Sequence, residues 1–223
     1  MELILKGLIW VLKEGATWRS LDLPGVAWQT VYGYHRKWAK SGFWAKLWDT
    51  LDLPADDGVR QVDSSCAKVH KDGANPQGGQ AQQAMGRTKG GLNTKFHFAI
   101  DGLGIPRALV LTAGQVNDCT QAIAVLQQSG NFRLAIMDKA YDTNEIRAFL
   151  TEVEAVACIP SKANRKQAIA HDPFDYRSRH KVENFFEKLK RTRRIATRYD
   201  KTDSSFLSFL FLAMTCLFLR NQF

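Results

Sequence analysis

Three acidic residues from distant parts of the chain have the chemistry to act together on a phosphate group. Asp63 stands in the stretch VDSS, Asp138 in MDKAYD, and Glu183 in the strongly basic stretch YRSRHKVENFFEKLKRTRR. Carboxylate oxygens suit Mg²⁺ and Mn²⁺, which also bind phosphate oxygens and water. Two such ions could activate a water or a 3′-hydroxyl and stabilise the leaving oxygen of an in-line displacement. The chemistry requires the three acids to meet in the folded chain.

Taken singly, the same acids have ordinary structural explanations. Asp63 could form a turn at the end of a strand, Asp138 could cap a helix, and Glu183 could serve only the solubility of a basic helix. Two further acids are expected to cap helices, Asp118 at the start of DCTQAIAVLQQ and Asp142 before TNEIRAFLTEVE. These alternatives make the fold the deciding question.

The hydrophobic pattern predicts the elements that would position the acids. Three short segments rich in β-branched and aromatic residues predict a meander, in which Asp101 lies in a hairpin turn, and two more strands alternate with helices. The predicted strands are VRQVDSSCAKVH, TKFHFAID, PRALVLTAG, RLAIMD and AVACIPS. The order βββαβαβαα is that of the ribonuclease H-like fold, a mixed sheet flanked by helices. Its first and fourth strands are neighbours, so Asp63 and Asp138 would meet at one edge of the sheet.

The basic stretch would supply the third acid from a helix. At about 100° per residue, one face within an arc of about 80° adjoins a stripe of apolar residues. That face holds Tyr176, Arg179, Glu183, Glu187 and Lys190, and the stripe holds Val182, Phe185, Phe186 and Leu189. Glu183 would therefore border the buried face, while Arg179 and Lys190 could neutralise a phosphate. The role of Glu187 stays open.

The N-terminal segment reads as a separate helical region. Residues 2–13 show helical spacing and end at Gly15, and residues 27–51 predict a helix, a turn at Ser41 and Gly42, and a second helix. This could be a helix-turn-helix that binds DNA, or a helical packing or dimerisation module. Residues 52–58 predict a linker, which gives a helical domain at 1–54 and a catalytic domain at 59–223.

Composition favours a polyanionic partner. The 223 residues carry a net charge of +9, concentrated in residues 176–201 with a smaller cluster at Arg87 and Lys89. Four cysteines without a C-x-x-C pair, and five histidines without zinc spacing, indicate reduced thiols in a cytosolic protein. The first residues do not resemble a signal peptide, and the apolar run at 206–219 is expected to be a buried helix, too short to span a bilayer.

Several motifs together resemble a known family. VDSS, GRTKGGLNTKFH, LTAGQVND, MDKAYD and the pattern Y-x₂-R-x₃-E-x₆-K, here Tyr176, Arg179, Glu183 and Lys190, resemble the bacterial DDE insertion-sequence transposases of the insertion sequence five type. The resemblance covers nearly all of residues 59–220. It implies an α/β, ribonuclease H-like catalytic domain in which Asp63, Asp138 and Glu183 bind two Mg²⁺ or Mn²⁺ ions. It also implies cleavage at the terminal inverted repeats of an element and joining of the 3′-hydroxyl ends to target DNA.

The resemblance also predicts partners and location. The expected partner is double-stranded DNA, both transposon ends and target, bound by a homodimer or higher oligomer in the cytoplasm, associated with the nucleoid and not with a membrane. The N-terminal segment looks like the DNA-binding region of the family, which usually has a further stretch before it, so an N-terminally truncated copy is one expectation. The alternatives are a non-catalytic DNA-binding regulator or decayed remnant, and a ribonuclease H-like nuclease without strand transfer.

Overall fold

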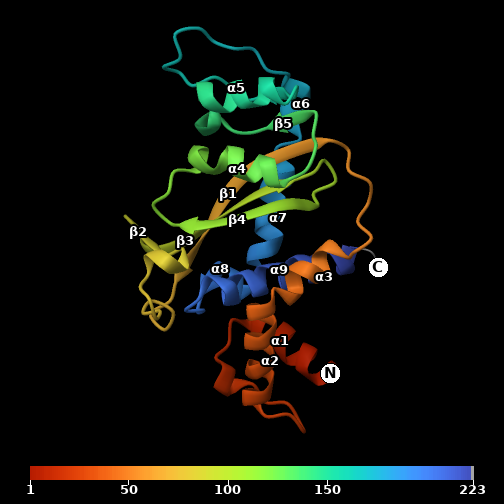
Figure 1. Ribbon diagram of the computed structural model, residues 1–223, viewed down its shortest axis with the longest axis vertical. Coiled ribbons are helices and arrows are strands. Elements are labelled where there is room, and N and C mark those ends of the chain that lie inside the picture. Colours follow the sequence, from red (N-terminus) through yellow and green to blue (C-terminus); the bar gives the residue numbers. More distant parts are fainter. Residues whose placement is uncertain (222–223) are drawn as a thin grey trace. The chain divides into compact units, whose positions relative to one another are not determined.

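The chain divides into two compact units in a computed structural model that describes residues 1–221 (Figure 1). We call the first the sheet unit; it consists of Pro54–Ser65 and Lys95–Phe186. The second, the helical unit, consists of Met1–Leu53, Cys66–Thr94 and the residues from Glu187 onward. The division at Leu53 falls inside the predicted linker. The helical unit also takes in segments from the middle and end of the chain, beyond the predicted boundary at residue 54.

The strands follow the order expected of a ribonuclease H-like sheet. Their hydrogen-bonded order is β2-β3-β1-β5-β6, with β4 also paired to β3. β1 pairs in parallel with β5, and β5 pairs in parallel with β6. The strands are β1 (Val59–Val69), β2 (Gly86–Thr88), β3 (Gly91–Ile100), β4 (Pro106–Ala113), β5 (Leu134–Ile136) and β6 (Val156–Cys158). The prediction that the first and fourth predicted strands, β1 and β5, are neighbours is confirmed.

Helices cover both faces of the sheet unit. Its helical elements are η3 (Asp118–Gln121), α4 (Ala122–Gln128), η4 (Lys139–Tyr141), α5 (Asn144–Glu152), α6 (Pro173–Arg177) and α7 (His180–Lys190), of which α7 continues into the helical unit. On one face, α4 and α5 share a buried core with Val62 of β1 and Ala99 of β3. On the other, Phe185 and Phe186 of α7 lie against Phe98, with ring centroids 4.9 and 5.9 Å apart. This alternation along β3 follows from the two-residue period of a strand.

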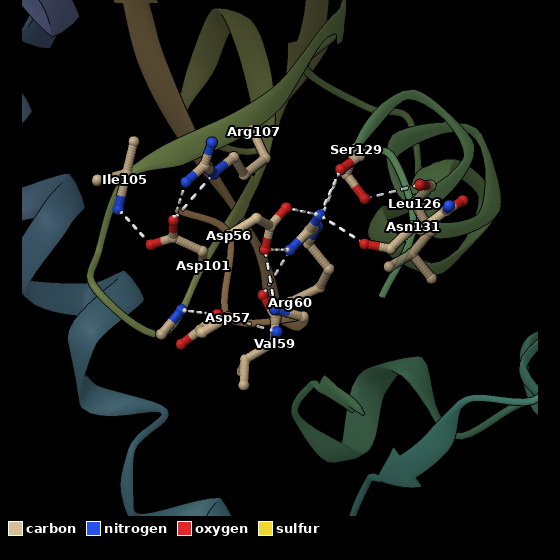
Figure 2. A network of polar contacts seen from close by, with 12 residues as sticks. Asp56, Asp57, Val59, Arg60, Asp101, Ile105, Arg107, Leu126, Ser129 and Asn131 are labelled. Carbon is tan, nitrogen blue, oxygen red and sulfur yellow. Dashed lines mark hydrogen bonds and ion pairs between the residues drawn. The ribbon is translucent and has the colours of Figure 1, made fainter. Parts of the chain in front are cut away.

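A polar network anchors the start of β1 (Figure 2). The buried Arg60 donates to the carboxylate of Asp56 and to the main-chain oxygens of Ser129 and Asn131. Asp57 accepts from the backbone of Val59 and of Gly102 in the β3–β4 turn. The predicted linker therefore ends in acids that fix β1 to the neighbouring turns.

The helical unit is built around the last helix. Gly42, with φ at 63°, is the single residue between α2 and α3, and α9 packs against α1, α2, α3 and α8. Its elements are α1 (Glu2–Glu14), η1 (Trp18–Ser20), α2 (Trp28–Ser41), α3 (Phe43–Asp49), η2 (Ala81–Gln83), α8 (Arg193–Ala196), β7 (Thr197–Arg198) and α9 (Asp203–Asn221). The apolar run at 206–219 thus belongs to a 19-residue helix. By length and composition alone this helix could cross a membrane, although the apolar run at 206–219 is itself shorter than the roughly 20 residues that a span needs. Its packing is that of a core helix.

A strand that was not predicted, β2, pairs in antiparallel fashion with the start of β3. Two predicted helix caps were wrong because the residue next to each aspartate provides the cap. Asn117 caps η3, while Asp118 forms an ion pair with Lys95 at 2.7 Å. Thr143 caps α5 by accepting from the backbone of Ile146. A neutral amide or hydroxyl oxygen suffices for a cap, which leaves the adjacent carboxylate for cationic partners.

Candidate active site

The pairing of β1 with β5 places two of the predicted acids in matching positions. Gln61 is the partner of Ile136 in the parallel register. Asp63 follows Gln61 by two residues, and Asp138 follows Ile136 by two residues. Because side chains alternate between faces with a period of two, both carboxylates point to the same face of the sheet as these partners. Asp138 lies just past the end of β5, where it caps η4.

That face is the one covered by α6 and α7. Ile136 packs with Leu134 and Cys158 in a cluster that Tyr176 of α6 covers. The intervening residue Ala135 belongs instead to the core under α4 and α5. The alternation of the strands therefore directs Asp63 and Asp138 toward the segment that carries the remaining predicted residues.

The basic stretch is not one continuous helix, contrary to the prediction. α6 ends at Arg177 and α7 begins at His180, so Arg179 lies in the turn between the two helices and Tyr176 belongs to the first. The turn is held to the sheet, because the amide of the buried Gln61 donates to the hydroxyl of Ser178 at 3.4 Å. The predicted apolar stripe is confirmed: Val182, Phe185, Phe186 and Leu189 are all buried.

From this turn, the guanidinium of Arg179 reaches all three predicted acids. Its Nη2 donates to Oδ2 of Asp63 at 2.9 Å and lies 3.9 Å from Oδ2 of Asp138. Its Nη1 donates to Oε1 of Glu183, one turn into α7. The structure thus brings the predicted triad together, and the residue at its centre is a cation.

The two aspartates are held in the same manner. Oδ1 of Asp63 accepts from the backbone N–H of Ser64 at 2.8 Å, and Oδ1 of Asp138 accepts from the N–H of Ala140 at 2.7 Å. In each aspartate the other oxygen, Oδ2, lies toward Arg179. Backbone donors thereby fix the carboxylates and leave one oxygen of each for the centre of the site.

Glu183 is the most accessible member of the group. Its side chain is 58% exposed, against 19% for Asp63 and 35% for Asp138. Glu183 borders the buried stripe as predicted, at Val182, but most of its side chain is exposed, and its carboxylate joins the other two at Arg179. An exposed glutamate one turn into a helix keeps the rotamer freedom to adjust to a ligand.

Burial and mutual charge shape the electrostatics of the site. Burial raises the pKa of Asp63 above its ordinary value, opposed by the Ser64 N–H and the Arg179 charge and reinforced by Asp138. Burial would lower the pKa of Arg179, but the carboxylates of Asp63 and Glu183 more than offset this and raise it. Arg179 is therefore a permanent positive charge among acids.

The ligand types at this site suit a divalent cation, but the distances between the carboxylates do not match those of a bound ion. Three carboxylates from β1, from the end of β5 and from α7 converge on one positive charge, and carboxylate oxygens are the ligands that hard cations prefer. In the part of the chain that the structure describes, no three potential ligands among His, Cys, Asp and Glu are placed to share an ion. The guanidinium of Arg179 approaches all three carboxylates.

The remaining predicted residues lie in different surroundings. Tyr176 is half-buried beside the acids, where burial raises the pKa of its phenol, an effect the Arg179 charge opposes. Arg87, in β2, and Lys89, in the turn that follows, are exposed in the helical unit. Lys190 also belongs to that unit, and burial lowers the pKa of its amine. Within the sheet unit, the structure assembles only Tyr176 and Arg179 with the triad.

Sequence reasoning missed one residue near the acids, Tyr141, and a basic cavity beside Asp142. Tyr141 of DKAYD is buried, and burial together with the charge of Asp63 raises its pKa above its ordinary value, so the phenol stays protonated. A basic cavity of about 510 Å³ opens beside Asp142, at the N-terminus of α5. Its cationic lining residues are Lys162, Arg165 and Lys166. The run SKANRK after β6 carried this signal, and the predictions gave it no role.

Comparison with known proteins identifies the family. The family model "Transposase DDE domain" matches residues 54–219, and "Putative transposase of IS4/5 family" matches residues 1–48. The "Putative transposase for insertion sequence element IS6501" of Brucella ovis is 38% identical over 130 residues, which are 58% of this chain and 100% of that protein.

Solved structures give more distant likenesses. The simian T-cell lymphotropic virus intasome in complex with PP2A regulatory subunit B56 gamma contains a chain 12% identical, with a TM-score of 0.41, over 92% of this chain and 66% of that one. The Mos1 transposase paired-end complex with left transposon end gives 12% identity and a TM-score of 0.30, over 85% of this chain and 79% of that one. The assignment rests on the matched family models and the bacterial relative, not on these structures. The chain belongs to the bacterial insertion-sequence DDE transposases of the IS4/5 type.

Proposed function

We propose that this transposase cuts DNA at the terminal inverted repeats of its insertion sequence and joins the freed 3′-hydroxyl ends to target DNA. The observation that supports this most strongly is the meeting of Asp63, Asp138 and Glu183 around Arg179. The three acids come from distant parts of the chain, and a purely structural role for each would not require them to converge. Their convergence matches the carboxylate requirement of phosphodiester chemistry.

In this proposal, Asp63, Asp138 and Glu183 hold two Mg²⁺ or Mn²⁺ ions. When bound, the ions supply activation of the attacking oxygen and stabilisation of the leaving one. The backbone N–H groups of Ser64 and Ala140 keep the two aspartates oriented. Arg179 and Tyr176 lie where they can contact the phosphate, and Gln61 holds the turn that carries Arg179. Lys190 is proposed to neutralise the phosphate as well, because it is the lysine of the motif Y-x₂-R-x₃-E-x₆-K.

Two basic surfaces are proposed to contact the DNA backbone. In the sheet unit, the cavity beside Asp142 carries three cations, Lys162, Arg165 and Lys166. In the helical unit, α2 buries Val31, His35 and Ala39 and exposes Arg36, Lys37 and Lys40. Arg87 and Lys89 add two exposed cations to the same unit. Such contacts supply affinity that is independent of sequence and falls with salt.

The proposal gives DNA binding and catalysis to different regions of the chain. Residues 1–54 would bind the element ends, and the ribonuclease H-like part would carry the chemistry, in a homodimer or higher oligomer assembled on DNA in the cytoplasm, at the nucleoid. The helices α2 and α3 are separated by Gly42 alone, where a DNA-binding helix-turn-helix has a turn of three to four residues. The exposed basic face of α2 is therefore the feature that supports DNA binding by this region.

The test is cleavage of DNA that carries the element's own ends. The variants Asp63→Asn, Asp138→Asn and Glu183→Gln should each abolish Mg²⁺-dependent cleavage while keeping DNA binding. Glu152→Gln, an exposed acid of α5, is the matched control and should cut normally. Unchanged cleavage by the triad variants would refute the assignment. Nicks without joined products would indicate a nuclease, and binding without any cleavage by the parent chain would indicate a regulator.

A further inference from the structure

One guanidinium serves three carboxylates at the centre of the candidate site. Arg179 contacts Asp63 and Glu183 through hydrogen bonds and approaches Asp138 to 3.9 Å. Without it, three carboxylates would face one another across a partly buried space, where like charges repel more strongly than in water. A single positive charge thus offsets the repulsion among the three acids.

The oxygens that Arg179 contacts are the ones a divalent ion would need. The Oδ1 atoms of Asp63 and Asp138 are taken by the N–H groups of Ser64 and Ala140, and the Oδ2 atoms lie toward the guanidinium. The side chain of Arg179 is only 17% exposed, and among the described residues its Nε is buried without a hydrogen-bond partner. Arg179 therefore fills the space between the acids and is incompletely paired there.

We propose that Arg179 is an internal cation that preassembles the three carboxylates and has to be displaced when divalent ions bind. The inference rests on the proposed two-ion site and adds to it a positioning residue that competes with the ions. The guanidinium cannot leave by losing its proton, because arginine stays charged in proteins. It has to rotate out, and the accessible side of the site is the one at Glu183, the most exposed of the three acids.

If Arg179 competes with divalent ions, its removal should affect the order of the metal-free site and the affinity for the ion in opposite directions. Removing Arg179 should loosen the metal-free site, because the acids lose their shared counter-charge. The same change should tighten binding of a divalent ion, because the ion no longer has to break the contacts with Asp63 and Glu183. A purely structural arginine predicts the opposite for binding, since a disordered site binds an ion less well.

The experiment measures Mn²⁺ binding to the full chain by calorimetry, without DNA, together with the melting temperature of the metal-free protein. The variants are Arg179→Gln, which removes the charge, and Arg179→Lys, which keeps the charge but replaces the planar fork with a point charge. Arg177→Gln is the control. Arg177 is exposed and lies two residues before Arg179, so this variant removes an equal charge close to the site. Asp63→Asn tests whether the binding site is the triad.

Arg179→Gln is expected to lower the melting temperature of the metal-free protein and to bind Mn²⁺ about 5- to 150-fold more tightly, the usual range of coupling between two ligands of one protein. Arg179→Lys should also bind Mn²⁺ more tightly than the parent chain. Because lysine keeps the positive charge, this gain would come from the lost guanidinium contacts and not from a change in net charge. Arg177→Gln should bind as the parent does. Binding to Arg179→Gln that is lost on adding Asp63→Asn would locate the gain at the triad.

The inference is overturned if Arg179→Gln and Arg179→Lys bind Mn²⁺ no more tightly than the parent chain while Asp63→Asn abolishes binding. That result would leave the proposed two-ion site standing. If neither the parent nor any Arg179 variant binds Mn²⁺, both the inference and the proposed metal chemistry fail. A gain of equal size in Arg177→Gln would also overturn it, because the effect would then be one of net charge.

Discussion

Arg194 and Asp200 form a buried ion pair inside the helical unit. Nε and Nη2 of Arg194 donate to the two carboxylate oxygens of Asp200 at 3.2 and 3.0 Å, and both side chains are at most 5% exposed. Nη1 donates to the main-chain oxygen of Ala16, and the guanidinium lies over the ring of Phe209 at 4.8 Å. The pair therefore connects α8 to the segment after α1 and to α9.

Removing one member of this pair should be costly. Asp200→Ala leaves a buried guanidinium uncompensated, and we expect it to lower the free energy of unfolding by about 3 to 5 kcal/mol. Urea unfolding followed by tryptophan fluorescence would measure the loss. The double variant Arg194→Met/Asp200→Leu should recover most of it, because an apolar pair of similar volume avoids the unpaired charge. A double variant as unstable as Asp200→Ala would contradict this account.

Stability should fall in mild acid because of two buried histidines. Burial lowers the pKa of both His35 and His97 to about 4. A histidine whose pKa is lower in the folded chain than its unfolded value of about 6.5 resists protonation in the folded state. Stability is therefore full above about pH 6.5, where the histidine is neutral in both states, and falls as the pH drops toward 4. At 1.36 kcal/mol per pKa unit, each contributes roughly 3 kcal/mol to the loss.

The variant His35→Phe isolates one of these contributions. Phenylalanine keeps the ring that stacks on Phe209, whose centroid is 4.2 Å away, but cannot take up a proton. Chemical unfolding at pH 7.5 and pH 5 should therefore show a smaller difference in stability for the variant than for the parent chain. An equal difference would mean that His35 titrates normally in the folded chain. The nearby charges of Asp200 and Arg194 act in opposite directions on His35 and leave burial as the main cause.

Capping of α5 gives a prediction that separates two adjacent residues. Thr143→Ala removes the hydroxyl that accepts from the Ile146 N–H and should cost about 1 kcal/mol. Asp142→Ala should cost more, about 3 to 5 kcal/mol, because Asp142 accepts from Arg147, Arg165 and the Lys162 N–H within a buried site. Urea unfolding of both variants compares the two. The reverse order would restore Asp142 as the cap.

The network at the start of β1 predicts a further cost. Arg60→Met leaves the main-chain oxygens of Ser129 and Asn131 and the carboxylate of Asp56 without their shared donor. Of these residues Ser129 is buried, and a buried acceptor left unpaired costs about 1 to 3 kcal/mol, so we expect a loss of about that size in urea unfolding. Arg133→Met, at an exposed position nearby, should change stability by less than about 0.5 kcal/mol. Equal effects of the two would show that the network is dispensable.

The sheet could be predicted because its strands carry strong local signals. β1, β3 and β4 match the predicted meander closely, since β-branched and aromatic residues alternate between Gly-containing turns. The neighbourhood of β1 and β5 then followed from topology and placed Asp63 near Asp138. Caps were predicted less well, since Asn117 and Asp118, or Asp142 and Thr143, satisfy the same local pattern. Lys95, which pairs with Asp118, lies more than twenty positions away, whereas Arg147, which pairs with Asp142, lies within α5 itself.

The centre of the site was only half predictable. Helical periodicity correctly linked Arg179 with Glu183, since residues four apart are neighbours on a helix. It could not show that the helix breaks after Arg177, where Ser178 accepts a hydrogen bond from Gln61, a residue more than a hundred positions away. Nor could it show that Arg179 turns toward Asp63, which is a property of the packed sheet.

The parallel register between β1 and β5 determines how the sequences of related transposases should be compared. Because Gln61 faces Ile136, an insertion of one residue within either strand would send one aspartate to the opposite face of the sheet. An insertion in the loops between the acids would leave their meeting unchanged. Related chains should therefore tolerate wide differences in length between the acids and almost none inside these strands. Homologous sites are better recognised by strand position than by sequence spacing.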